Sequence, residues 1–477
     1  MVLSDGFLVL PLLIAVLYAS VETVSDVYSR KNYQRKIDVD SNVQQPWRGQ
    51  TTLIFALLAV SLGLGNVLRL PYIIGEQGGG AFLLVYVAVL TLVVSPVLIA
   101  ELTLGSLGRS SPMGSIQWVA SLAGRDTRWR WIGALQAILA LSIASLMMVP
   151  AVLGAEASFY LYRGDWDAAS ANDIIDTLSA IDSADHLRVL GVLVALVIVA
   201  ALPGPQVVLF LAGWVILPLI LLMMYAGLGF AFDVGDIAAA NEWIFKYRPE
   251  QLTEAGIFSA ALAALSSLGA GVGVGLVFGS RSPEGLPLVR SVIAVAILDT
   301  AFMLVLAIII VAVTAAVDVE MVQGLALLVV SIPYATANLP TGELFGLVIM
   351  MSILLATVAA LIALIEPMVS ILRREFDVPR LLAMIIVALV LWVSGALMMS
   401  EPLARQTIDT WLVPVLVPFV LGVTALFAVW RVPRPILRGE KYREPFAVFY
   451  VWYVIARWLT PVFCFTLSVL ALLRLVL

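Results

Sequence analysis

The sequence predicts an all-α integral membrane protein with about twelve transmembrane helices. Of its 477 residues, 62% are hydrophobic and only 12% are charged, whereas soluble domains carry roughly 45–50% apolar and about 25% charged residues. Twelve apolar runs also approach the roughly 20 residues that a helix needs to cross the hydrocarbon core. These observations place the whole chain in a bilayer and leave no segment long and polar enough for a separate aqueous domain.

The apolar runs divide into one extra N-terminal helix, which we number helix 0, and helices 1 to 11. Their ranges in order are 7–21, 51–74, 81–104, 131–162, 187–202, 207–232, 256–278, 288–317, 344–372, 381–399, 408–430 and 448–477. Helix 0 could be a secretory signal peptide. The absence of a basic start and of a small-residue cleavage site favours a retained helix. A further run, 325–334, is too short to span, which predicts a re-entrant or surface-lying segment.

Composition also limits the chemistry. The single cysteine, Cys464, excludes disulfide frameworks, thiolate metal sites and iron–sulfur clusters. The single histidine, His186, excludes His-based zinc sites and leaves little basis for a Ser-His-Asp triad. A net charge of −5 argues against a nucleic-acid partner. We therefore expect transport, signalling or scaffolding within the membrane and not an enzyme.

Lysine and arginine residues predict the orientation, because they accumulate in cytoplasmic loops. Their five clusters all fall on one side of the twelve-helix arrangement and cover 30–48, 109–130, 281–290, 373–380 and 431–443. An acidic segment, 165–185, lies on the opposite side. These loops predict a multi-pass protein of the cell inner (plasma) membrane, with both termini on the outer or periplasmic side.

Helices 1 and 6 share the motif S-L-G-x-G, at 61–65 and 267–271. Five helices separate the motifs, so the two segments run in opposite directions, as in an inverted repeat of helices 1–5 and 6–10. Glycine costs about 1 kcal/mol relative to Ala in a helix interior. Interrupted helices at matching places in two halves point to a substrate site. The alternative is close helix packing through small residues.

Ionisable residues within apolar runs sharpen this choice, since each costs about 2.5–3.5 kcal/mol at a helix centre. Glu101, Asp299 and Glu366 lie inside such runs, and Arg69 follows the helix 1 motif by about one turn. These side chains are not expected to face lipid. For Glu101 and Glu366, the alternative is a structural role, in which they cap unwound amides or bond between helices.

The segment Trp47–Tyr72 reads WRGQTTLIFALLAVSLGLGNVLRLPY, and EQGGGAF follows at 76–82. With Glu101, these residues closely resemble the start of the neurotransmitter:sodium symporter family, whose fold is like that of the bacterial leucine transporter. Further matching motifs are SLGAG at 267–271, ILDT at 297–300, EPM at 366–368, IDTW at 408–411 and ARWLTP at 456–461. The resemblance implies an inverted-repeat 5+5 transporter fold with broken helices 1 and 6, in a divergent member.

The resemblance also implies a division of the chain. Residues 1–46 would form the extra N-terminal helix and a basic cytoplasmic linker. The first repeat would cover 47–232, the second 233–432, and helix 11 would lie in 433–477.

Site residues follow from the resemblance position by position. Amides at the helix 1 break would hold a substrate carboxylate, and the substrate-binding positions are Leu64, Gly65, Ala264, Ser267, Gly269 and Ala270. Ser61, Asn66 and Asp299 match the oxygen ligands of the first sodium site. Arg69 and Asp409 match the pair that closes the outer vestibule. Glu101 matches the carboxylate that braces unwound helix 6.

Several positions depart from the family. No tyrosine lies near 146–149, where the family places one against the substrate carboxylate, and this weakens an amino-acid substrate. The two hydroxyl ligands of the second sodium site fall on Ala359 and Ala360, so we expect one sodium ion only. Ala264 and Ala270 replace common aromatic residues of the pocket, which leaves a wide cavity or one filled by another group.

The leading hypothesis is sodium-coupled uptake of a small organic solute, an amino acid or a related carboxylate or amine, by alternating access. One alternative is a non-transporting sensor or membrane subunit of an assembly, with helix 0 docking a membrane partner. The other is proton-coupled or exchange transport without sodium. The expected partners are a small-molecule substrate and the lipid bilayer.

Overall fold

The structure is a computed structural model that describes residues 49–63, 69–204, 210–283, 285–318, 322–438 and 444–476. Helix 0, the basic linker, and the predicted site residues Leu64, Gly65 and Asn66 lie outside the described residues. Everything below concerns the unit that begins at Arg48.

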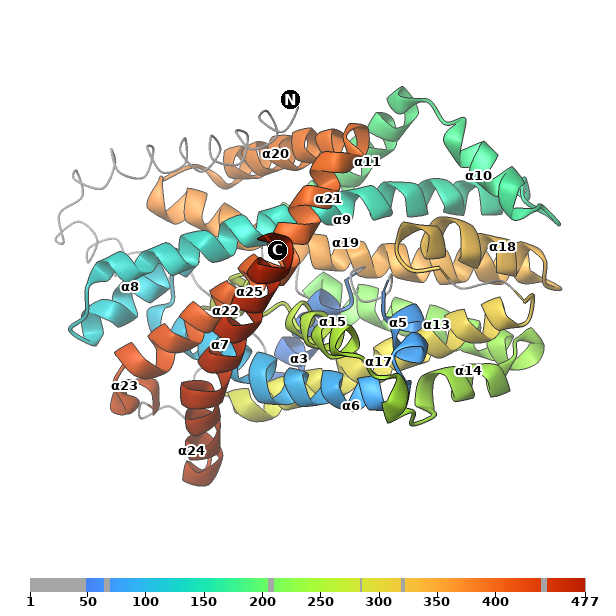
Figure 1. Ribbon diagram of the computed structural model, residues 1–477. Coiled ribbons are helices and arrows are strands. Elements are labelled where there is room, and N and C mark those ends of the chain that lie inside the picture. Colours follow the sequence, from blue (N-terminus) through green and yellow to red (C-terminus); the bar gives the residue numbers. More distant parts are fainter. Residues whose placement is uncertain are drawn as a thin grey trace. The chain divides into compact units, whose positions relative to one another are not determined.

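The described residues form helices joined by short turns (Figure 1). The first half contains α3 Gln50–Ser61, α5 Leu70–Glu76, α6 Gly80–Val89, η1 Leu90–Val94, α7 Ser95–Gly108, α8 Pro112–Leu122, η2 Thr127–Arg130, α9 Trp131–Arg163, α10 Ala171–Ser179, α11 Ser183–Ala201, η3 Ala212–Ile216, α13 Leu217–Val234 and α14 Ile237–Phe245. The second half contains η4 Pro249–Gln251, α15 Glu254–Leu265, α16 Val274–Gly279, α17 Leu288–Ala315, η5 Leu327–Ser331, α18 Ile332–Ala337, α19 Gly342–Glu375, α20 Arg380–Ser400, α21 Pro402–Trp411, η6 Leu412–Leu416, α22 Val417–Leu426, η7 Phe427–Arg431, α23 Arg434–Arg438, α24 Phe446–Val454, η8 Ile455–Leu459 and α25 Thr460–Val476.

Nine helices of the described part are long and apolar enough to cross a membrane. They correspond to predicted helices 2 to 5 and 7 to 11. Helices 1 and 6 are each divided into two shorter helices, α3 with α5 and α15 with α16. Eleven of the twelve predicted helices are therefore accounted for, and the all-α membrane fold is confirmed. The proposed repeat boundaries stay a prediction.

Burial separates the centre of the bundle from its periphery. The most apolar window of α19 is 78% buried, whereas that of α11 is only 28% buried. Helices α9 and α19 pack side by side along the middle of the bundle (Figure 1). Because lipid tails are as apolar as the side chains, exposed apolar faces of α11, α20 and α25 are expected to face lipid.

Helices α7 and α16 pack closely through glycines. Gly105 of α7 lies against the backbone of Leu276, and Gly279 of α16 lies against the backbone of Leu102. A Cβ atom at either glycine would collide with the other helix. Small residues therefore allow the second half of helix 6 to rest directly on helix 2.

The run predicted as a re-entrant or surface-lying segment forms η5 and α18, a short apolar helix of 11 residues from Leu327 to Ala337. It packs on α9, α17 and α19. Its length does not span a bilayer, as expected, but its inner face is buried in protein.

Candidate functional site

The backbone of helix 6 is interrupted where the glycine motif lies. Helix α15 ends at Leu265 and α16 begins at Val274. Between them Gly269, Gly271 and Gly273 have φ values of 63°, 79° and 74°, a left-handed conformation that glycine adopts at little cost. Leu268 has φ 37°, which is rare for a residue with a Cβ atom. The glycines therefore interrupt the helix, which the packing interpretation alone does not explain.

Helix 1 is interrupted at the matching place. Helix α3 ends at Ser61 and its second part, α5, begins at Leu70. The Ser61 hydroxyl donates a hydrogen bond to the Leu58 carbonyl oxygen at 2.8 Å, so its side chain turns back onto the last turn of α3. The same carbonyl oxygen accepts a hydrogen bond from the Leu62 amide at 3.3 Å, at the end of α3.

Asp299 of α17 lies beside the helix 6 break. Its Oδ2 accepts a hydrogen bond from the Ser267 hydroxyl at 2.7 Å. Both side chains are buried, at 2% and 1% exposure. A buried carboxylate requires hydrogen bonds or a compensating charge, and among the described residues no ion pair includes Asp299. The Asp299 carboxylate is therefore able to bind a cation or a proton.

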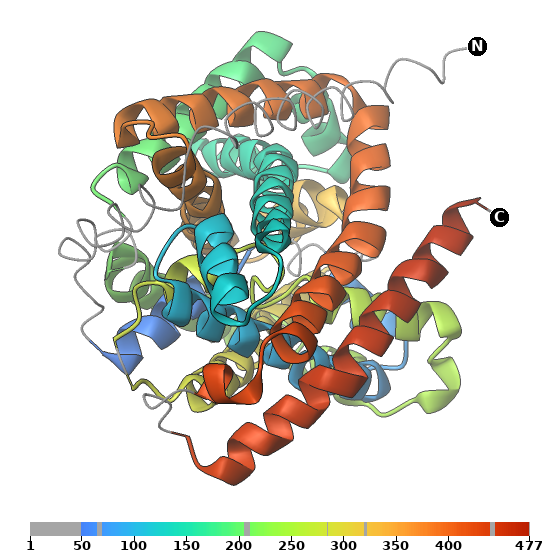
Figure 2. The same ribbon diagram turned by 90° about the vertical axis from the view of Figure 1, so that its left-hand side faces the viewer.

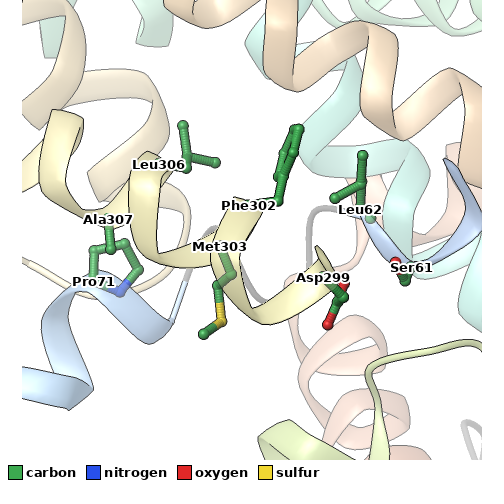
Figure 3. A pocket seen from close by; sticks show the side chains of 9 residues that line it. Ser61, Leu62, Pro71, Asp299, Phe302, Met303, Leu306 and Ala307 are labelled. Carbon is green, nitrogen blue, oxygen red and sulfur yellow. The ribbon is translucent and has the colours of Figure 1, made fainter. Parts of the chain in front are cut away.

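A small cavity joins Asp299 to the end of α3 (Figure 3). It encloses about 20 Å³, which is room for about one water molecule. Its lining comes from α3, α5 and α17 and comprises Ser61, Leu62, Gly63, Pro71, Asp299, Phe302, Met303, Leu306 and Ala307. The carboxylate and the serine are the two side chains in this lining that offer oxygen. The Asp299 carboxylate and the backbone carbonyl of Ser61 were predicted as ligands of a sodium ion.

Tyr86 of α6 is a further polar group at this place. Its ring is fully buried, and its hydroxyl lies close enough to Asp299 and Ser267 to interact electrostatically. That hydroxyl makes no hydrogen bond of ideal geometry. The sequence interpretation missed this residue, although a lone tyrosine in an otherwise apolar run is a usable signal.

Glu101 connects the helix 6 break to the rest of the bundle. Its Oε1 accepts hydrogen bonds from the Gly271 amide at 3.0 Å and from Nε2 of Gln136 at 2.7 Å. Gln136 of α9 also donates to Oγ1 of Thr424 on α22, at 2.8 Å. A carboxylate that braces unwound helix 6 must bond the backbone of the unwound stretch, and the Gly271 contact does so. Gln136, which the sequence interpretation missed, extends the network to two further helices.

Glu366 has a structural environment. Its Oε1 accepts a hydrogen bond from Arg380 at 2.5 Å, and the same arginine donates to the carbonyl oxygens of Ala201 and Leu202 at the end of α11. This carboxylate therefore bonds between helices, which was the alternative considered for it.

The predicted outer pair lies together. Arg69 Nη2 and Asp409 Oδ2 are 2.6 Å apart, with 46% and 39% of the side chains exposed. Arg69 precedes α5, and Asp409 belongs to α21, so the pair joins the second half of helix 1 to the outer end of helix 10. An exposed pair contributes only about 0–1 kcal/mol, so this contact can break and reform at small cost.

Comparison with known proteins agrees with the resemblance found in the sequence. The profile of the family described as the sodium:neurotransmitter symporter family matches residues 44–164. An uncharacterized sodium-dependent transporter of Methanocaldococcus jannaschii is 23% identical over 84% of each chain. An uncharacterized sodium-dependent transporter of Bacillus subtilis is 22% identical over 87% of this chain and 95% of the relative. The chain is thus similar to the sodium:neurotransmitter symporter family in its first third and to sodium-dependent transporters over most of its length.

The solved structures agree on the fold. The crystal structure of MhsT in complex with L-phenylalanine matches with a TM-score of 0.79 at 22% identity, over 90% of this chain and 99% of MhsT. The chain therefore has the fold of MhsT. The matching family model and the relatives named as sodium-dependent transporters support sodium-coupled transport.

The two positions at which the sequence analysis expects the ligands of a second sodium site to be lost lie inside the bundle. Ala359 and Ala360 of α19 are buried. A Cβ atom placed at Gly63 would lie 3.0 Å from Cε of Met147 and 3.6 Å from Cβ of Ala360. Met147 thus approaches the helix 1 break from the stretch of α9 in which the family tyrosine was expected.

Of the remaining predicted substrate positions, Ala264 and Ala270 are buried and Gly269 is half-buried. Ala264 closes the last turn of α15, and Ala270 lies in the interrupted stretch. A Cβ atom placed at Gly269 would lie 3.0 Å from Cγ1 of Val60 on α3. The lining of the cavity beside Asp299 does not include Ala264, Gly269 or Ala270, so the cavity does not reach these predicted solute positions.

Proposed function

We propose that this protein is a secondary transporter that couples one sodium ion to the uptake of a small organic solute by alternating access. The observation that carries the proposal is the buried Asp299, hydrogen-bonded to Ser267 in the helix 6 break and facing a cavity at the end of α3. A single flexible stretch of backbone thus contacts both the cation position and the predicted solute position.

Charge explains why a sodium ion belongs beside Asp299. A carboxylate at the centre of a transmembrane helix is costly, by about 2.5–3.5 kcal/mol on insertion scales. A cation bound by Asp299, Asn66 and the Ser61 carbonyl would neutralise it with hard oxygen ligands, which suit a small alkali ion. Emptying the site would leave the charge exposed to an apolar wall made by Leu62, Phe302 and neighbours. Ion binding therefore stabilises one arrangement of helices 1, 6 and 7.

The second site is proposed to be absent. Ala359 and Ala360 supply no oxygen from their side chains, and the thioether of Met147 lies beside Gly63 instead. A sulfur and two methyl groups are poor ligands for sodium. We therefore infer a stoichiometry of one sodium ion for each solute.

An amino acid or a related carboxylate or amine is the proposed solute class. Amides of Leu64 and Gly65 at the helix 1 break would hold a carboxylate, since helix ends with free amides favour anions. MhsT, which shares the fold, was crystallised with L-phenylalanine. Small side chains at Ala264, Gly269 and Ala270 would leave space for the side chain of the solute once the site opens.

The proposal also includes the orientation of the chain in the membrane. We place the arginine-rich loops in the cytoplasm and both termini on the outer side of the inner membrane. Helix 0 as a docking element for a membrane partner stays a prediction, because it lies outside the described residues.

The deciding experiment uses the full chain in proteoliposomes. The 20 common amino acids are first screened by thermal shift in sodium chloride and in choline chloride. Uptake of each stabilising amino acid is then measured against sodium concentration. We expect a hyperbolic dependence with a Hill coefficient near one. A sigmoidal dependence would contradict the loss of the second site.

A proton-coupled mechanism is the competing function, and the Asp299–Ser267 contact gives it support. A protonated Asp299 could donate a hydrogen bond within the same cluster and so remain neutral without sodium. Uptake that is indifferent to sodium but driven by a pH gradient would establish this alternative. Binding without any uptake would favour the non-transporting sensor.

A further inference from the structure

A second polar assembly lies far from the transport site, at the end of the bundle that carries α8 and α23 (Figure 2). Four arginines there stack on aromatic rings, and we call them the arginine–aromatic cluster. Its members are Arg431, Arg434, Arg438 and Arg457, with Trp129, Trp430, Phe446, Tyr453 and Trp458 as the rings. None of these residues belongs to the proposed transport mechanism.

The rings hold the guanidinium groups in place. The Arg434 guanidinium lies 4.4 Å from the centre of the Tyr453 ring, and that of Arg457 lies 4.5 Å from the Trp430 ring. Arg438 lies 5.0 Å from Phe446. Such cation–π contacts position a cation without neutralising its charge.

Hydrogen bonds fix the framework that carries these groups. The indole of Trp430 donates to the carbonyl oxygen of Arg457 at 2.8 Å, and Tyr453 donates to the carbonyl oxygen of Val429 at 3.0 Å. Arg457 in turn donates to the Tyr453 hydroxyl at 2.6 Å. The end of helix 10 and the first half of helix 11 therefore form one ordered surface.

The charge of the cluster is not balanced within the described part of the protein. The ion pairs found among those residues use other basic side chains, and none includes Arg431, Arg434, Arg438 or Arg457. Arg128, which precedes the ring of Trp129 in sequence, pairs with Asp126. Four positive groups with donors to spare predict an anionic ligand.

The surroundings of the cluster indicate a lipid. Helix 11 is peripheral, with only 33% of its apolar window buried. Trp458 is 57% exposed, and exposed aliphatic side chains of Val451, Leu459 and Val462 lie along the same helix. Trp and Tyr gather at membrane–water interfaces, where arginines reach phosphate groups.

We propose that the arginine–aromatic cluster binds the headgroup of an anionic phospholipid, with the acyl chains along the exposed face of helix 11. The guanidinium groups bond the phosphate oxygens, and the aromatic rings lie at the level of the glycerol backbone. A soluble phosphate would use the same donors but would gain nothing from the exposed aliphatic face.

Native mass spectrometry of the purified full chain in detergent tests the proposal. Phosphatidylglycerol and phosphatidylcholine with identical acyl chains are compared, and glycerol phosphate is the soluble arm. We expect bound phosphatidylglycerol and little bound phosphatidylcholine. Arg434→Gln should weaken phosphatidylglycerol binding about fivefold, and a triple change that adds Arg431→Gln and Arg438→Gln about 100-fold.

Arg128→Gln is the matched control, because Arg128 lies at the same end, is 92% exposed and stacks on no ring of the described part. It should leave lipid binding unchanged. Thermal stability in detergent micelles with added phosphatidylcholine should be equal for all variants, which separates lost binding from lost folding. Equal binding of the two lipids, equal loss in the control, or equally tight binding of glycerol phosphate would each overturn the proposal.

Discussion

The two sides of the helix 1 break differ sharply in chemistry. On the side of α17, Asp299, Ser267 and the cavity beside Ser61 place oxygen atoms around one small space. On the side of α19, Gly63 meets the thioether of Met147 and the methyl group of Ala360. The same interrupted helix thus borders a polar site and an apolar one. Under the proposed function, this contrast means that two small side chains remove an ion site while the backbone keeps the break.

The largest expected effect comes from removing the charge on the polar side. Asp299→Ala should reduce sodium-dependent uptake by at least about 100-fold, because the cation would lose its charged ligand in an apolar setting. Thr300→Ala is the control, since the Thr300 hydroxyl bonds only the Ala296 carbonyl of its own helix. Uptake in proteoliposomes at several sodium concentrations measures both. Normal sodium dependence in Asp299→Ala would remove the polar side from the mechanism.

A smaller effect is expected when the carboxylate stays but loses its partner. Ser267→Ala removes the 2.7 Å hydrogen bond to Asp299, and hydrogen bonds to charged groups contribute about 1.5–3 kcal/mol. We expect sodium affinity to fall about tenfold or more. The adjacent Ser266→Ala offers a close control, because Ser266 is exposed and bonds carbonyl oxygens of its own helix. Radioactive sodium binding to the purified protein distinguishes the two, and equal affinities would contradict the assignment.

The exposed Arg69–Asp409 pair should have a modest effect. Arg69→Ala removes a contact of about 0–1 kcal/mol, so the balance between outward-open and inward-open states should change by about fivefold at most. Distances measured between spin labels on α5 and α21 report this balance. Arg405→Ala is the control on α21. A double variant with Asp409→Ala should match either single variant, and additive effects would show that the pair does not act as a unit.

The smallest effect is expected on the apolar side. Ala360→Ser adds one hydroxyl group, which should bond the carbonyl oxygen four residues earlier, as Thr357 does with Ile353 in the same helix. Sodium affinity should therefore change by no more than about twofold. The Hill coefficient of uptake checks this. A Hill coefficient well above one would mean that a single oxygen restores the second site. The two sides of the break would then differ by only one ligand.

Local sequence signals predicted the breaks, and the family resemblance predicted the outer pair. Glycine is the residue that adopts positive φ most readily, so the motif at 267–271 indicated an interruption without any knowledge of packing. Arg69 and Asp409 were paired by resemblance, and the structure places them 2.6 Å apart. The extent of the helix 1 break from Leu64 to Leu68 lies outside the described residues.

Contacts that depend on how the helices pack could not be predicted from local sequence signals. The sequence interpretation gave Ser267 to the solute and Asp299 to the cation, whereas a hydrogen bond joins them. Gln136 and Met147 lie on α9, which is apolar on most sides, so periodicity does not indicate which face of that helix meets the break. Such partners follow from the rotation of each helix within the bundle, which a single sequence leaves undetermined.

The exposed position of the Arg69–Asp409 pair has a consequence for the driving ion. Salt weakens interactions between exposed charges, with a screening length of about 10 Å at 0.1 M. Under the proposed function, sodium chloride acts twice: its cation binds beside Asp299, and its ionic strength weakens an exposed contact. A sodium titration at varying ionic strength would mix site occupancy with electrostatic screening. With choline chloride holding the ionic strength constant, the sodium dependence reports site occupancy, and a choline chloride titration at fixed sodium concentration reports the screening of the surface pair.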